Sequence, residues 1–191
     1  MGDITALFGS FENIKVGIVG DVMLDAYMWG KVDRISPEAP VPIVAVHKKE
    51  YRIGGAGNVA LNICSLGAKA SVLSVMGDDD EGQLLKKMFE DHRIDTGFLL
   101  QSHKRITTHK TRIIARNQQM MRLDQELTDD LGYEDENRLI LAVQHYIAQE
   151  KPQIIILEDY NKGVLTALVI EKIIDLCRHN GILTAVDPKR K

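Results

Sequence analysis

The sequence predicts an α/β fold, a mainly parallel, doubly wound sheet with helices on both faces. Short, strongly apolar runs such as 15–20 and 154–157 alternate with segments of helical periodicity. Strands this apolar need cover on both faces, which is typical of parallel sheets. Acidic residues directly follow several of these runs, where parallel strands end and ligands bind.

The predicted elements follow one another with two interruptions. Residues 3–12 place four apolar side chains on one helical face, and 15–20 is a buried strand. The later elements are a helix carrying Val59, Ile63 and Leu66 and ended by Gly67, a strand at 70–76, a helix capped by residues 77–80, a hairpin at 105–124, a helix at 134–150, a strand at 154–157, a helix at about 166–179 and a strand at 182–186.

The interruptions are residues 26–50 and 105–124. The first holds Pro37, Pro40 and Pro42, which exclude a helix and favour extended edge strands. The second alternates in side-chain type around a polar turn near Asn117, as a hairpin does.

Length and composition exclude several classes of protein. The 191 residues suit one sizeable domain, and the net charge of -3 argues against a generic nucleic-acid binder. No apolar run reaches the length of a membrane span. The first residues show no basic segment followed by an apolar core, so we expect no secretory signal. Cys64 and Cys177 lack metal-binding or C-x-x-C spacing, so we expect free thiols and a cytoplasmic location without membrane or nucleic-acid partners.

A glycine cluster, Gly54-Gly55-Ala56-Gly57-Asn58, precedes a predicted helix. Glycines let the backbone approach a ligand closely, and Asn58 can donate to and accept from a sugar diol. The cluster lacks the Gly-Lys-Ser/Thr ending of a P-loop, and the first strand is not followed by a dinucleotide fingerprint. A turn that only caps the helix remains an equal alternative.

Two aspartates follow the first strand. Asp25 lies between Leu24 and Ala26, an apolar setting in which a carboxylate needs a partner, and two sugar hydroxyls could supply it. Asp21 fits an Asx turn or a cap better.

Cations concentrate on the hairpin, where Lys110 and Arg112 share one face by alternation. Arginine binds phosphate with two parallel hydrogen bonds, so an anionic substrate group is plausible. The alternative is a solvated face whose cations pair with Asp124 and Glu126. The arginine candidates are Arg112, Arg116 and Arg122.

Polar residues also follow the last two predicted strands. Asp159 and Lys162 come after the strand at 154–157, and Asp187 and Lys189 come one strand later. These residues could serve a metal, a phosphate or a sugar hydroxyl, or they could simply form turns. The six histidines show no metal-ligand spacing, so no metal ligands are assigned.

Six segments in order resemble the kinase region of heptose-7-phosphate kinases, a branch of the ribokinase-like (PfkB) carbohydrate kinases. That region often belongs to a bifunctional kinase/adenylyltransferase of ADP-heptose synthesis. The stretches at 34–42 and 116–124 are the most specific to this branch. The segments are Val-Gly-Asp-Val-Met-Leu-Asp-Ala-Tyr (19–27), Arg-Ile-Ser-Pro-Glu-Ala-Pro-Val-Pro (34–42), Gly-Gly-Ala-Gly-Asn-Val-Ala-Leu-Asn-Ile (54–63), Arg-Asn-Gln-Gln-Met-Met-Arg-Leu-Asp (116–124), Asp-Tyr-Asn-Lys-Gly (159–163) and Val-Asp-Pro-Lys (186–189).

The resemblance implies a ribokinase-like fold for residues 1–191, with a β-lid formed by about 26–50 and 105–124. It implies ATP and Mg²⁺ as cofactors, a sugar phosphate as substrate and a homodimer formed through the lid. Sugar hydroxyls would be held by Asp25, Gly54, Gly55 and Asn58, with Asp159 and Lys162 nearby, while Asp187 and Lys189 approach the nucleotide phosphates.

One family motif is missing. Ribokinase-like enzymes carry a downstream Gly-Ala-Gly-Asp whose aspartate is the general base, and residues 1–191 contain no such motif. The resemblance therefore implies a fragment that ends before the C-terminal part of the fold, with its catalytic base beyond Lys191. Residues 1–191 alone are expected to be inactive. The alternatives are a sugar-phosphate-binding or dimerisation fragment, and a kinase of another sugar.

Overall fold

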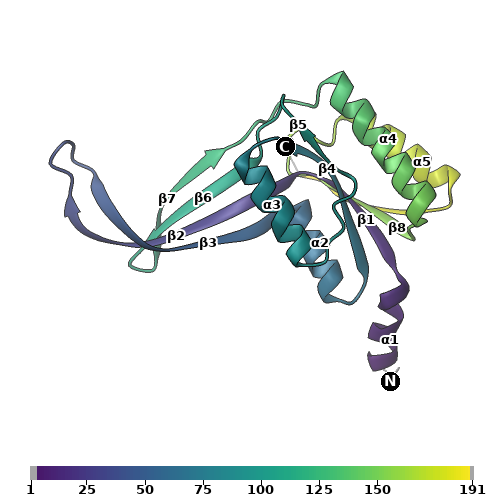
Figure 1. Cartoon of the computed structure of the whole chain (residues 1–191), viewed down its shortest axis with the longest axis horizontal. Coiled ribbons are helices and arrows are strands. Elements are labelled where there is room, and N and C mark those ends of the chain that lie inside the picture. Colours follow the sequence, from purple (N-terminus) through teal and green to yellow (C-terminus); the bar gives the residue numbers. More distant parts are fainter. Residues whose placement is uncertain (1–3, 190–191) are drawn as a thin grey trace.

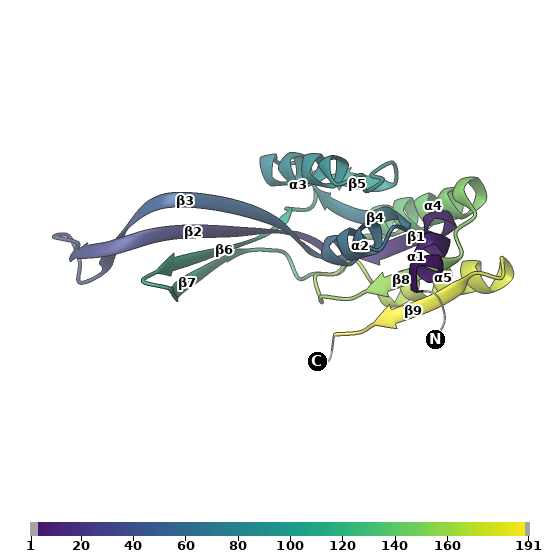
Figure 2. The same cartoon turned by 90° about the horizontal axis from the view of Figure 1, so that it is seen from below.

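The computed structural model describes residues 4–189 and contains two sheets (Figure 1). The core sheet is parallel throughout, with strand order β5-β4-β1-β8-β9. A second sheet, the lid sheet, projects from one end of it (Figures 1 and 2). The core strands are β1 (Lys15–Gly20), β4 (Lys69–Gly77), β5 (Leu99–Ser102), β8 (Ile154–Glu158) and β9 (Leu183–Asp187).

Helices cover both faces of the core sheet, which confirms the predicted doubly wound fold. In β1, the fully buried Ile18 joins a cluster with Phe89, whereas the fully buried Val19 joins one with Leu139 and Ile173. Each such side chain contributes about 1.5–3 kcal/mol by leaving water. The helices are α1 (Ile4–Ser10), followed by the 3-10 turn η1 (Phe11–Asn13), α2 (Ala56–Ser65), α3 (Asp80–Asp91), α4 (Tyr133–Glu150) and α5 (Ala167–His179).

The lid sheet has the strand order β3-β2-β6-β7 and takes its strands from two parts of the chain. β2 (Val22–Ile35) leaves the core only one residue after β1 and pairs antiparallel with β3 (Pro42–Gly55). β6 (Thr108–Ala115) runs parallel to β2 and pairs antiparallel with β7 (Gln118–Gln125). The expectation of edge strands holds for β3 only, because β2 is paired on both sides.

The apolar side of α2 packs against the core, but the most deeply buried residues of the helix are small ones. Val59 and Ile63 are only half-buried and Leu66 is 45% exposed, while the small residues Ala56 and Ala60 are fully buried. Small side chains let the helix lie close to the sheet, so close approach decides its orientation rather than apolar volume.

The four-residue strand β5 was not predicted, because so short a run carries little periodicity. Cys64 and Cys177 are free thiols, half-buried and buried respectively. Across residues 4–189, every helix is too short or too polar to cross a membrane.

Candidate functional site

A cavity of about 560 Å³ lies between the lid sheet and the segments that follow β8 and β9. The glycine turn before α2 forms part of the cavity wall. Because the cavity is also lined by residues that follow β8 and β9, it lies beyond the carboxyl ends of the core strands, which is the usual ligand position in such folds. Its charged lining consists of Asp25, Asp124, Glu126, Arg52, Lys110, Arg112, Arg122, Lys162 and Lys189.

Six of these side chains are cations and three are carboxylates. The surrounding chain has a net charge of -3, so the cavity is a positive region on an acidic protein. Field lines concentrate in such a cleft, which favours an anionic ligand.

An ion pair connects β2 to β6 in the wall of the cavity. Arg112 Nη1 donates to Asp25 Oδ1 at 2.5 Å, and both side chains are mostly buried. The guanidinium groups of Arg112 and Arg52 also lie over the ring of Tyr27. Arg112 is therefore the charged partner that a carboxylate in the apolar setting of Asp25 needs. The ion pair and the contact with the Tyr27 ring hold Arg112 on the cavity side of the lid.

The glycine turn brings β3 close to the aspartates. Gly55 has a φ of 59°, and a Cβ there would lie 2.2 Å from the carbonyl oxygen of Asp21. A Cβ on Gly54 would lie 2.5 Å from Asp25 Oδ2. Both positions exclude a side chain for steric reasons. Asn58 is exposed one turn into α2, where it lines the same cavity.

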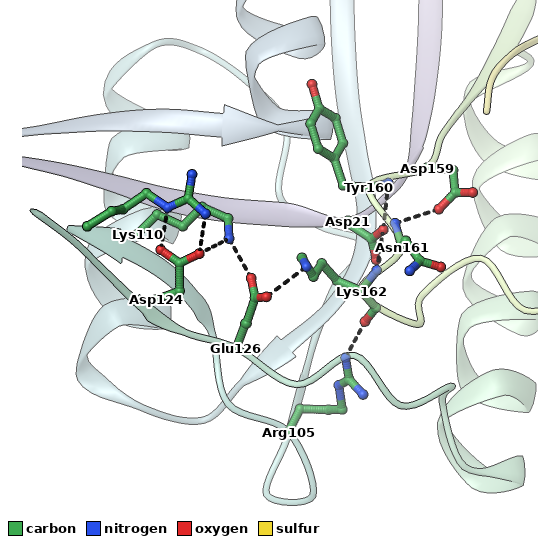
Figure 3. A network of polar contacts seen from close by, with 10 residues as sticks. Asp21, Arg105, Lys110, Asp124, Glu126, Asp159, Tyr160, Asn161 and Lys162 are labelled. Atoms are coloured by element: carbon green, nitrogen blue, oxygen red, sulfur yellow. Dashed lines mark hydrogen bonds and ion pairs between the residues drawn. The ribbon is translucent and has the colours of Figure 1, made fainter. Parts of the chain in front are cut away.

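A network of ion pairs joins the lid to the loop after β8 (Figure 3). Asp124 accepts from Arg122 Nε and Nη2, each at 2.8 Å, and from Lys110 Nζ at 3.0 Å. Glu126 bridges two ammonium groups, with Oε2 2.5 Å from Lys110 Nζ and Oε1 2.9 Å from Lys162 Nζ. Burial opposes ionisation of Glu126, but hydrogen bonds from both lysines hold its pKa below the ordinary value.

The backbone of the loop at 159–164 is held by the side chain of Asp21. This carboxylate is 1% exposed and accepts from the backbone amides of Tyr160, Lys162 and Val164 at 2.9–3.1 Å. Burial raises the pKa of Asp21, and the three amides counteract the rise. Arg105 Nη2 donates to the carbonyl oxygen of Lys162 at 2.6 Å, as Figure 3 shows. Asp21 thus fixes the backbone that presents Lys162.

Two carboxylates meet where β8 and β9 end. Glu158 and Asp187 are register partners, and Glu158 is only 4% exposed. Burial, together with the neighbouring charges of Asp187 and Asp159, raises the pKa of Glu158 to about 7. Within residues 4–189 no group of three or more His, Cys, Asp or Glu side chains could hold a metal ion.

A second cavity, of about 650 Å³, lies at the opposite end of the core sheet. Lys15 and Lys69, where β1 and β4 begin, line it, and so does Glu150 at the end of α4, which pairs with Lys15. Helix C-termini carry partial negative charge and disfavour anions. It is not the ligand end of a parallel sheet, so the cavity under the lid is the candidate site.

The structure gathers most of the sequence candidates around this one cavity. Two do not line it. Arg116 lies at the tip of the β6–β7 hairpin with a φ of 51° and donates to the carbonyl oxygen of Val32, and Asp159 accepts from the amide of Asn161. Asp187 also lies outside the lining, beside Glu158. The candidates that line the cavity are Asp25, Gly54, Gly55, Asn58, Arg112, Arg122, Lys162 and Lys189.

Sequence reasoning assigned no ligand role to several cavity residues. Lys110 and Glu126 carried a signal, since Lys110 alternates with Arg112 on one face of the hairpin and Glu126 is one of the carboxylates expected to pair with such cations. Tyr27 and Tyr160 belong to two of the segments that carry the family resemblance, whereas Arg52 carried no signal. The pairing of β2 with β3 and the loop after β8 bring these residues to the cavity.

A doubly wound α/β core with a small β-lid over a polar cavity is the architecture of a class of carbohydrate kinases. The carbohydrate kinase from Agrobacterium tumefaciens matches it with a TM-score of 0.69 and 18% identity, over 91% of this chain and 53% of that one. The tetrameric inhibited form of phosphofructokinase-2 from Escherichia coli gives a TM-score of 0.68 and 16% identity, over 92% and 55%. These likenesses show the fold.

Residues 13–191 match the pfkB family carbohydrate kinase, and the chain belongs to that family. It is 41% identical over 187 residues to the Bifunctional protein HldE of Geobacter sulfurreducens. It is 43% identical over 174 residues to the protein of the same name from Aliarcobacter butzleri. The matches cover 98% and 91% of this chain but only 38% and 36% of those relatives.

Proposed function

We propose that this chain is part of an ATP-dependent kinase that phosphorylates D-glycero-D-manno-heptose 7-phosphate at the anomeric C1 hydroxyl, a step toward the heptose of lipopolysaccharide core. The single observation that carries the proposal is the excess of cations around the cavity of a pfkB family chain, six against three carboxylates. Lys189 can serve the nucleotide, but a neutral sugar would not need the cations on the lid, whereas a sugar phosphate would. The heptose itself rests on the motif resemblance.

Within this proposal, Asp25, Asn58 and the backbone of Gly54 and Gly55 hold the sugar hydroxyls. Asp25 Oδ1 is occupied by Arg112, which leaves Oδ2 beside Gly54 for a hydroxyl. Arg112 and Arg122 are the remaining arginine candidates for the substrate's phosphate. Asp159 does not line the cavity and acts through the loop that carries Lys162, where it accepts from the amide of Asn161.

The transfer forms a bond between the C1 oxygen and the γ-phosphorus of ATP and breaks the bond to the bridging β,γ-oxygen, so ADP leaves. The hydroxyl proton passes to a general base, which the resemblance places outside residues 1–191. Positioning and electrostatic stabilisation supply most of the catalysis in such transfers. Because residues 1–191 lack the motif that supplies this base, we expect negligible turnover from them alone. Robust ATP-dependent phosphorylation of the heptose by these residues would contradict this expectation.

ATP and Mg²⁺ fit this chain in part. Lys189 lies over the Tyr160 ring at 5.8 Å and lines the cavity, so it can meet a nucleotide phosphate. Glu158 and Asp187 offer the oxygen ligands that Mg²⁺ prefers, yet two carboxylates are too few for a complete shell. When bound, the metal would neutralise charge on the phosphates.

A sugar-phosphate-binding or dimerisation module without catalysis is the second candidate. Met121 and Leu123, both more than half exposed on β7, favour an association of two lids. Calorimetry on residues 1–191 with heptose 7-phosphate and with ADP distinguishes this non-catalytic module from part of a kinase. Binding of the sugar without the nucleotide supports a partial site, and a panel of other sugar phosphates tests the heptose assignment. Cytoplasmic location and a homodimer remain part of the proposal.

A further inference from the structure

The Lys110–Glu126–Lys162 bridge has unusual features for a surface ion pair. The two lysine side chains are only 13% and 12% exposed, and they come from the lid and from the core loop respectively. One carboxylate serves both, with one oxygen for each ammonium group (Figure 3). Asp124 also pairs with Lys110 and with Arg122, so the whole network sets three cations against two carboxylates and keeps one net positive charge at the wall of the cavity.

Glu126 differs from its partners in the backbone that carries it. It follows the last residue of β7, outside any regular element, and its side chain is 22% exposed. Lys162 stands on a loop that Asp21 and Arg105 fix through its backbone, and Lys110 stands inside β6. The backbone that presents the two ammonium groups is thus fixed by strand pairing and by hydrogen bonds, and an anion that takes the place of the carboxylate would keep both groups paired.

A phosphate monoester offers two oxygens in the same bridging arrangement, with nearly twice the charge of a carboxylate. We propose that Lys110 and Lys162 form the subsite for a phosphate monoester of the substrate, and that Glu126 occupies this subsite as a resident counter-ion until the anion displaces it. The inference rests on the proposed function and names the residues that meet the anion. Glu126 keeps the lysines in place and charge-balanced when the site is empty.

The test is calorimetry on the 191-residue chain with inorganic phosphate as the probe. Glu126→Gln removes the competitor but keeps its shape, so phosphate affinity should rise about fivefold, whereas Lys110→Met or Lys162→Met should lower it about tenfold. A merely structural role predicts weaker binding in all three variants. The matched control is Glu134→Gln, which breaks the exposed Lys104–Glu134 pair outside the cavity and should leave phosphate affinity unchanged.

Several outcomes would overturn the subsite. They are weaker or unchanged phosphate binding by Glu126→Gln, unchanged binding by both lysine variants, or no phosphate binding by either the parent chain or Glu126→Gln. Titration with heptose 7-phosphate and with ADP separates the two phosphate sources, because the subsite requires the lysine variants to weaken the sugar phosphate and spare ADP. Failure of the kinase proposal would appear separately, as intact binding of inorganic phosphate without binding of heptose 7-phosphate, since no turnover is expected from residues 1–191.

Discussion

At the scale of single residues, neighbouring positions of one motif serve different physical purposes. Gly55 is needed because its backbone is left-handed and touches the carbonyl oxygen of Asp21. Gly54 is needed because Asp25 lies against it. The motif therefore both shapes a turn and positions a candidate sugar ligand, so the two sequence interpretations of the glycine cluster are compatible.

Gly55→Ala is expected to destabilise the chain by about 2 kcal/mol or more, because it combines a strained φ with a backbone clash. Urea unfolding followed by circular dichroism measures it. Gly132→Ala is the control, since a Cβ there meets nothing within 4 Å. Equal stability of the two variants would contradict the steric explanation.

Two arginines of the β6–β7 hairpin are expected to differ in their importance for ligand binding. Arg112→Ala should weaken binding of heptose 7-phosphate about tenfold, because it removes a cavity cation and leaves Asp25 without its partner. Arg116→Ala should change it little, because that side chain contacts only the carbonyl oxygen of Val32. Calorimetry on both variants decides, and an equal loss would place the hairpin tip in the site.

The raised pKa of Glu158 should make the stability of the chain depend on pH. Its pKa is about 7 in the folded chain against an ordinary value of 4.5, so the folded state binds more protons than the unfolded state in that interval. Stability should therefore fall as the pH rises from 4.5 to about 7. Glu158→Gln should flatten this part of the curve of melting temperature against pH. An unchanged slope in the variant would show that another group is responsible.

At the scale of elements, the loop at 159–164 depends on a residue far away in sequence. Asp21 lies between β1 and β2, and its carboxylate holds three amides of the loop. The sequence indicated a local turn or cap for Asp21, whereas the structure shows a long-range anchor. Its position one residue after β1 also marks the point where the chain leaves the core for the lid.

Asp21→Asn should loosen this loop without unfolding the core. An amide group offers one accepting oxygen instead of two, so at least one loop amide loses its partner, at about 1–3 kcal/mol. Hydrogen exchange at the amides of Tyr160, Lys162 and Val164 should accelerate. Asp159→Asn, which affects only the amide of Asn161, serves as the comparison. Unchanged exchange in the Asp21 variant would contradict the anchor.

At the scale of the whole molecule, the lid sheet has two unlike faces. Arg112 and Arg122 are register partners that line the cavity, so their neighbours Ile113 and Met121, also partners, lie on the opposite face. Met121 is 55% exposed there. One face of the lid is therefore suited to an anion and the other to an apolar partner.

If two lids associate through that outer face, Met121→Lys should shift the chain toward the monomer in analytical ultracentrifugation, because it places a charge in an apolar contact. Lys86→Met, a change of the same pair of residue types on α3, is the control for altered surface charge and should leave the association state unchanged. A parent chain that sediments as a monomer at high concentration would contradict the dimer.

The amino-acid sequence by itself determined the fold class, the order of nearly all elements and the family, because apolar runs, caps and motif order are local properties of the chain. It did not determine that Ala56 and Ala60 are the most buried residues of α2, nor that β5 exists. Only the tertiary structure decided that Arg116 lies away from the cavity, that Asp21 anchors a distant loop and that Glu126 joins Lys110 to Lys162. These depend on which strands pair and how closely backbones approach, and such long-range contacts are set by packing of the whole chain rather than by any local pattern.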